Sequence, residues 1–169
     1  FRSDFEPAVE LSEKYSDNVY IMESLGLKCL SGGDYKKAVE YFKNGLQKDS
    51  NQTYLYYDLA RAYQKLNISD KVREYFDKFT EFNPKYVKGL FDYANWLIEI
   101  SDFEDARRKL EKALKIEPDN IDILNKLFFV QYTLVRKNVS EYNIREAISV
   151  SNKAKEFGKF DYNPELQEL

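Results

Sequence analysis

The 169-residue chain contains no histidine and a single cysteine, Cys29. Without histidine it lacks the side chain that proteins use most often as a general base and as a metal ligand near neutral pH. A lone cysteine excludes an intrachain disulfide and leaves the redox compartment open. The chain also lacks a glycine-rich phosphate-binding loop. These absences predict that the chain is not an enzyme and that it binds no metal and no other cofactor.

The chain also lacks a large excess of charge of either sign, and it has no long apolar run. The chain has 26 Lys and Arg against 29 Asp and Glu, a net charge of -3, and the two signs are mixed throughout. A nucleic-acid partner is disfavoured because no extended basic field is present. Direct membrane insertion is also disfavoured, since no apolar run approaches the roughly 18 residues that would span a bilayer.

Glycine and proline are scarce, at six and four residues, whereas tyrosine and phenylalanine number 14 and 12. Few helix-breaking residues and a hydrophobic content of 43% favour a folded, helical chain. A chain of 169 residues forms one ordinary domain or a short array of repeats. The many rings therefore belong either to the core or to a contact surface.

The sequence repeats with a period of about 34 residues. Five positions show it most clearly, namely Leu59, Ala60, Tyr63, Phe76 and Pro84, which Tyr93, Ala94, Leu97, Leu110 and Pro118 follow at that distance. Apolar residues at helical spacing predict two helices in each unit, as over residues 19–30 and 35–48. Asp34 and Ser69 are the predicted N-caps of two of the second helices.

The period divides the chain into units. We expect a flanking helix at 1–18 as the second helix of a partial preceding repeat, and a C-terminal segment or the start of a capping helix at 159–169, all in a single structural domain. Ala147 comes seven residues late and predicts an insertion near 135–143, as a longer first helix or a longer loop. The phase of the two ends predicts a segment of a longer array or of a larger protein. The four units are 19–52, 53–86, 87–120 and 121–158.

Small and bulky residues alternate in the units as in a known family. The third unit has Leu90, Tyr93, Ala94, Leu97, Ala106, Leu110, Ala113 and Pro118. This pattern resembles the signature of the tetratricopeptide repeat family. The resemblance implies an all-α fold, a right-handed α-solenoid of antiparallel helix pairs, with about four repeat units plus flanking helices.

The resemblance also implies a binding surface on the concave side, formed by the first helix of each unit. Helical geometry indicates which side chains are not used for packing and point there. The predicted partner-binding residues are Tyr20, Leu27, Tyr54, Tyr57, Arg61, Lys88, Phe91, Asn95, Asn125, Phe129 and Tyr132. We expect Tyr54, Tyr57, Phe91 and Phe129 to be partly exposed as a group, although an aromatic stripe on a helix is often core.

This mixture of rings and polar groups predicts a scaffold or adaptor that binds a peptide or helix of a partner protein in an aromatic-rich groove, for complex assembly. Members of the family that bind chaperone tails clamp a carboxylate with Lys, Asn and Arg. The matching residues here are Glu23, Leu27, Asp58, Lys88 and Asp92. Only Lys88 fits, so we expect an apolar or aromatic-bearing segment instead.

Two alternatives remain open. In the first, the chain is a structural subunit that packs or self-associates through its repeat ends or its convex face. In the second, it is the regulatory array of a larger protein. In the structural role, residues 160–169 are a candidate to occupy the groove.

Overall fold

The computed structural model describes residues 18–137 and 141–156. This part of the chain is all-α, with eight helices that pack as sequential antiparallel pairs. The predicted helix over residues 1–18 lies outside the described part except for Asn18, and so does the predicted C-terminal segment. None of the described helices is long and apolar enough to cross a bilayer.

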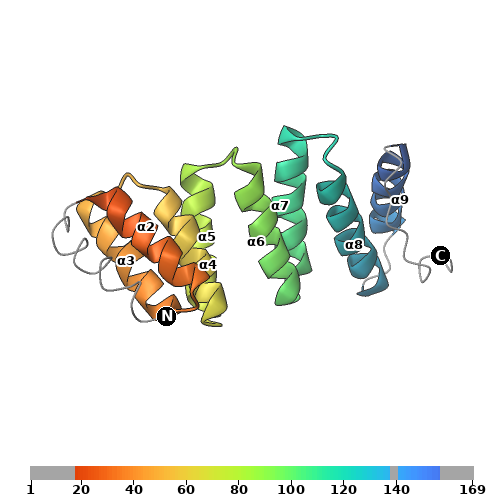
Figure 1. The fold of residues 1–169 in the computed structure, drawn as a ribbon. Helices are drawn as coiled ribbons and strands as arrows, with labels where there is room; N and C mark the ends of the chain where they lie inside the picture. Colours follow the sequence, from red (N-terminus) through yellow and green to blue (C-terminus); the bar gives the residue numbers. More distant parts are fainter. Residues whose placement is uncertain (1–17, 138–140, 157–169) are drawn as a thin grey trace. The chain divides into compact units, whose positions relative to one another are not determined.

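The chain divides into two compact units, Phe1–Pro84 and Lys85–Leu169. In each unit every described helix packs against the next one in the sequence, as Figure 1 shows. The helices of the first unit are α2 (Val19–Ser31), α3 (Tyr35–Lys48), α4 (Tyr54–Lys65) and α5 (Ser69–Phe82). Those of the second are α6 (Val87–Glu99), α7 (Phe103–Ile116), α8 (Ile121–Lys137) and α9 (Glu141–Glu156).

The turn within three successive helix pairs has the same backbone geometry. Gly33, Asn67 and Ser101, which occupy the same position in successive repeats, have positive φ angles of 84°, 57° and 62°. In each case the next residue donates its N–H to a carbonyl five residues back, which is the Schellman hydrogen bond that ends a helix. These bonds are Asp34 to Cys29 at 2.9 Å, Ile68 to Tyr63 at 3.1 Å and Asp102 to Leu97 at 2.8 Å. The sequence period is therefore also a period of backbone conformation.

The left-handed conformation is costly for serine, because a Cβ crowds the carbonyl oxygen there. We expect Ser101→Gly to raise the free energy of unfolding by about 0.5–1 kcal/mol. Gly33→Ala should lower it by a similar amount through backbone strain alone, since a Cβ at Gly33 meets nothing within 4 Å. Chemical unfolding of both variants checks this, and a neutral or destabilised Ser101→Gly would contradict it.

The two predicted N-caps have different outcomes. Asp34 caps α3 as predicted, since its Oδ1 accepts the N–H of Lys37 at 3.3 Å. The prediction for Ser69 was wrong: Ser69 is the first helical residue of α5, and Ile68 precedes it without a side-chain cap. The Schellman bond donated by Ile68 fixes the turn so that the helix starts one residue earlier than the cap pattern predicts.

Small residues allow the helices of the first unit to approach closely. A Cβ at Gly26 of α2 would lie 2.3 Å from the Phe42 ring of α3, and this ring is completely buried. Cys29 and Ala38 are buried beside this contact, so Cys29 is a core residue, as its place on the apolar face predicts. Burial raises the pKa of the Cys29 thiol, and Asp34 raises it further, so the reactive thiolate is disfavoured.

The helix α8 is 17 residues long, whereas α2, α4 and α6 have 12 or 13. It ends at Lys137, within the segment where the sequence predicts an insertion. Part of the extra length is therefore helical.

Candidate partner-binding surfaces

The first helices of the first unit, α2 and α4, carry one surface, which we call the α2/α4 face. Its members are Tyr20, Glu23 and Leu27 of α2 with Tyr54, Asp58 and Arg61 of α4. Their spacing of three or four residues puts each set on one side of its helix, and the two helices are in contact. Tyr20 is 66% exposed, Tyr54 is 50% exposed and Leu27 is also exposed. Three large apolar side chains thus face solvent where a packed helix would bury them.

Tyr57 does not belong to this face, and the prediction of its exposure was wrong. It is only 8% exposed, and its ring lies 5.2 Å from that of Phe79 and 6.2 Å from that of Phe76. Phe79 of α5 occupies a place where the family pattern has a small residue, so its ring reaches across to α4. Tyr57 is therefore a core residue of the unit, and its substitution would change stability rather than binding.

Asp58 is a buried carboxylate that is absent from the predicted binding residues. Its side chain is 8% exposed, and its Oδ1 lies 3.5 Å from Nη1 of Arg61, a long contact for an ion pair. The pKa of Asp58 is raised to about 6, chiefly because the carboxyl is buried; Arg61 lowers this pKa in part, and the carboxylate of Glu23 contributes a smaller rise. The sequence offers one indication that this carboxylate is buried, because Asp58 lies within the largely apolar stretch from Leu55 to Ala62.

In the second unit, α6 and α8 supply the remaining predicted residues. Lys88 is exposed and forms an ion pair with Asp92 at 2.7 Å. Phe91 is half-buried, as are Asn95 and Asn125. The expectation of partial exposure is therefore confirmed for Phe91, as it is for Tyr54 and for Phe129.

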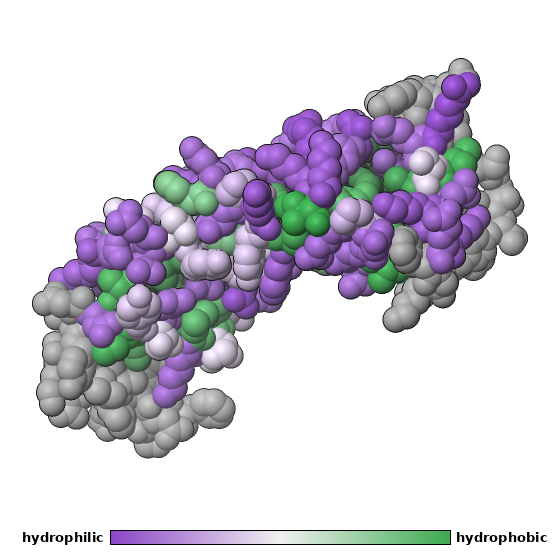
Figure 2. Space-filling model, turned by 90° about the horizontal axis from the view of Figure 1, so that it is seen from above, coloured by the Kyte–Doolittle hydropathy of each residue, from purple (hydrophilic) through white to green (hydrophobic). Residues whose placement is uncertain are grey.

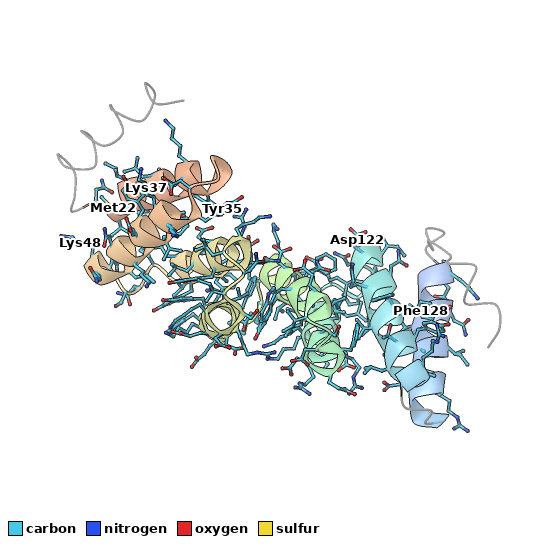
Figure 3. All side chains as sticks on the ribbon, turned by 90° about the horizontal axis from the view of Figure 1, so that it is seen from below. Met22, Tyr35, Lys37, Lys48, Asp122 and Phe128 are labelled. Carbon is cyan, nitrogen blue, oxygen red and sulfur yellow. The ribbon has the colours of Figure 1, made fainter. Side chains whose placement is uncertain are left out.

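A pocket of about 220 Å³ lies between the starts of α6 and α8. Its lining residues are Val87, Lys88, Phe91, Glu117, Asn120, Asp122 and Ile123. Figure 3 labels Asp122 on the first turn of α8 and Phe128 farther along the same helix. The pocket is smaller than the roughly 300–1,000 Å³ of small-molecule sites. Its lining mixes apolar side chains with charged and amide groups.

Farther along α8, Phe129 is 49% exposed and Tyr132 is half-buried. The Tyr132 ring stacks on that of Phe128 at 6.4 Å, and the guanidinium of Arg136 lies 5.9 Å from it. Tyr132 is therefore held in place by its own helix, while Phe129 is presented to solvent.

A separate stack of rings lies between α4 and α5 in the first unit. Phe82 stacks on Tyr56 at 5.7 Å, Tyr56 on Tyr75 at 6.3 Å, and Tyr75 on Tyr63 at 5.5 Å. Tyr63 and Tyr75 are buried, whereas Phe82 at the end of the stack is exposed. On the face that Figure 2 shows, apolar residues form small groups among hydrophilic ones. The exposed rings are thus local features on a charged surface.

The antiparallel helix pairs recur with the period of the sequence, and their first helices leave apolar side chains exposed. These two features together are typical of a helical-repeat scaffold for protein–protein interaction. Residues 30–90 match the family model described as tetratricopeptide repeat. Residues 30–90 are thus of the tetratricopeptide repeat type, and the chain is similar to proteins of that family. Repeats of this type are protein–protein interaction modules.

Two relatives illustrate the similarity in sequence. The chain is 28% identical over 107 residues to "Protein STIP1 homolog" of Dictyostelium discoideum, which covers 63% of this chain and 19% of that protein. It is 26% identical over 125 residues to "RNA polymerase II-associated protein 3" of Mus musculus, which covers 74% of this chain and 19% of that protein. The match thus spans about a fifth of the length of each relative.

Two solved structures share the fold. A crystal structure of MamA has a TM-score of 0.76 at 17% identity and covers 89% of this chain and 84% of its own. The first tetratricopeptide repeat domain of Spaghetti (RPAP3), bound to the HSP90 peptide SRMEEVD, has a TM-score of 0.63 at 21% identity. It covers 69% of this chain and 93% of its own. At these identities the likeness concerns the fold.

Proposed function

We propose that the chain binds a segment of a partner protein, a peptide or a helix, on the surfaces of its first helices, and so serves the assembly of a complex. One observation carries this proposal. Tyr20, Leu27, Tyr54 and Phe129 all lie on first helices and all remain exposed, although the same helices bury most of their other apolar residues. Exposed rings with interspersed polar groups are typical of protein-binding surfaces.

The complex of RPAP3 with an HSP90 peptide supports a peptide as the class of ligand, because a domain of the same fold is bound to one. The acidic sequence of that peptide does not suit the present chain. Glu23 and Asp58 stand where the family's chaperone-tail binders carry a cation and an amide, and both would repel a carboxylate. We therefore propose a partner segment that differs from an acidic chaperone tail.

The test uses the double variant Leu27→Ser with Tyr54→Ser, which removes apolar area from the α2/α4 face. The amount of partner protein captured from a cell extract on the immobilised chain should fall at least tenfold, because hot-spot residues typically contribute more than about 1.4 kcal/mol to binding. Leu27 is 39% exposed and Tyr54 50%, and the Tyr54 ring lies 5.9 Å from that of Phe79, so the melting temperature should fall modestly while the double variant stays folded.

Phe82→Ser is the matched control, because it removes an equally exposed ring from the stack between α4 and α5. It should leave the captured partners unchanged. The reverse result, loss with Phe82→Ser and retention with the double variant, would support the alternative role as a subunit that packs through α4 and α5.

A further inference from the structure

The α2/α4 face combines its exposed apolar side chains with two carboxylates. Asp58 of α4 is close enough to Glu23 of α2 to sense its charge, and its side chain is largely withdrawn from water. Burial of a carboxylate costs several kcal/mol of free energy unless a well-placed cation offsets it. The two acids therefore place negative charge among the exposed apolar side chains of the face, with Arg61 beside them.

Arg61 offsets this charge only in part. It approaches one oxygen of Asp58 at 3.5 Å, whereas charge-assisted hydrogen bonds are normally about 2.7–2.9 Å. Its side chain is 45% exposed, and its guanidinium also lies 5.5 Å from the Tyr57 ring. Burial is the main cause of the raised pKa of Asp58, and Arg61 lowers that pKa only in part. A buried carboxylate with one long contact to a cation, next to exposed apolar side chains, is a candidate functional group.

The arrangement of the face also defines what would satisfy it. Along α2 the order is Tyr20, Glu23, Leu27, so a carboxylate stands about one turn from each of two exposed apolar side chains. Along α4 Tyr54 precedes Asp58 by one turn in the same way. A ligand that matches both helices needs a cation flanked by apolar groups.

Resting on the function proposed above, we propose that the α2/α4 face binds a partner segment in which an arginine or lysine lies between apolar residues. The basic side chain takes its place between Glu23 and Asp58, and its apolar neighbours contact Tyr20, Leu27 and Tyr54. The charge complementarity is the reverse of that in a carboxylate clamp, and the cation supplies the neutralisation that Arg61 does not complete.

The test is a selection of displayed random twelve-residue peptides on the immobilised chain, followed by binding measurements with a fluorescein-labelled copy of an enriched peptide. Enriched peptides should carry Arg or Lys within two residues of Leu, Phe or Tyr. Asp58→Asn should weaken binding of the labelled peptide about tenfold or more, and Arg61→Gln should strengthen it by removing a competing cation. Replacing the basic residue of the peptide by norleucine should weaken binding to the wild type but not to Asp58→Asn.

Other outcomes separate this proposal from the one on which it rests. If the enriched peptides lack a basic residue, or Asp58→Asn binds them as well as the wild type, the charge proposal fails. Loss of binding by the variant with Leu27→Ser and Tyr54→Ser would in that case leave the proposed function intact. If neither variant weakens binding, or no peptide is enriched, both proposals fail.

Discussion

Replacement of Gly26 by alanine is expected to lower the free energy of unfolding by about 3 kcal/mol, close to the upper range for overpacking in a core. The added Cβ would lie 2.3 Å from Cε1 of Phe42, and contacts under 3 Å require a neighbour to move. The Phe42 ring is fully buried between helices and cannot move without disturbing its surroundings. Urea unfolding followed by circular dichroism measures the effect.

Gly45→Ala is the matched control for this variant. Both glycines lie inside helices, so alanine gives both the same gain in helix propensity of about 1 kcal/mol. A Cβ at Gly45 meets Cδ1 of Leu55 at 2.8 Å, which is the flexible end of a side chain. Gly45→Ala should therefore cost much less. Adding Phe42→Leu should recover part of the loss in Gly26→Ala, and equal stability of the two single variants would contradict the close approach of α2 and α3.

Asp58→Asn is expected to stabilise the protein at pH 7.5 by about 2 kcal/mol. The folded protein raises the pKa of Asp58 from its ordinary value of 3.8 to about 6, and a rise of this size corresponds to about 3 kcal/mol when the group is ionised in both states. Asparagine removes this cost but keeps a buried amide and loses the contact with Arg61, so the gain is smaller.

The sign of the pH dependence follows from the raised pKa. Well below pH 3.8 Asp58 is protonated in both the folded and the unfolded state and carries no penalty; at pH 4 only the unfolded state has begun to ionise, so the penalty is still small. As the pH rises through 6 the folded state must ionise a buried group, and the wild type loses stability relative to Asp58→Asn. Unfolding by urea at pH 4, 5, 6 and 7.5 should show a difference that grows from a small value to a plateau.

Asp92→Asn is the control, because Asp92 occupies the same position in the next repeat and pairs with an exposed Lys88. Loss of this ion pair should change stability by about 0.2–1 kcal/mol or less. If Asp58→Asn is less stable than the wild type at pH 7.5, Asp58 contributes to the fold through its pairing. The same variant should bind a basic peptide less tightly, so a gain in stability would accompany a loss of binding.

The period and the helix pairs could be predicted from the sequence because both depend on local pattern. Turn residues such as Gly33, and small residues such as Ala38, identify the pairs without knowledge of distant contacts. The exposure of Tyr57 could not be predicted in this way. Tyr54 and Tyr57 are three residues apart on one helix, and which of them faces solvent depends on how far Phe79 of another helix extends.

The charge on the candidate surface shows a second limit. The sequence contains Glu23 and Asp58 but does not show that one of them is buried, because burial depends on the contact between α2 and α4. The pKa of Asp58 depends on that burial and on the distance to Arg61. Residue types at matching positions excluded a carboxylate clamp, whereas the geometry led to the basic ligand proposed here.

The packing of each helix on its sequence neighbours also has a kinetic consequence. Within each compact unit the contacts are local, because α2 packs on α3, α3 on α4 and α4 on α5, with the same order from α6 to α9. Chains dominated by local contacts fold fast, often within microseconds to milliseconds, since little loop entropy is lost before contacts form. Hydrogen exchange in Gly26→Ala should therefore accelerate first in α2 and α3, while the amides of α6 and α7 keep their protection.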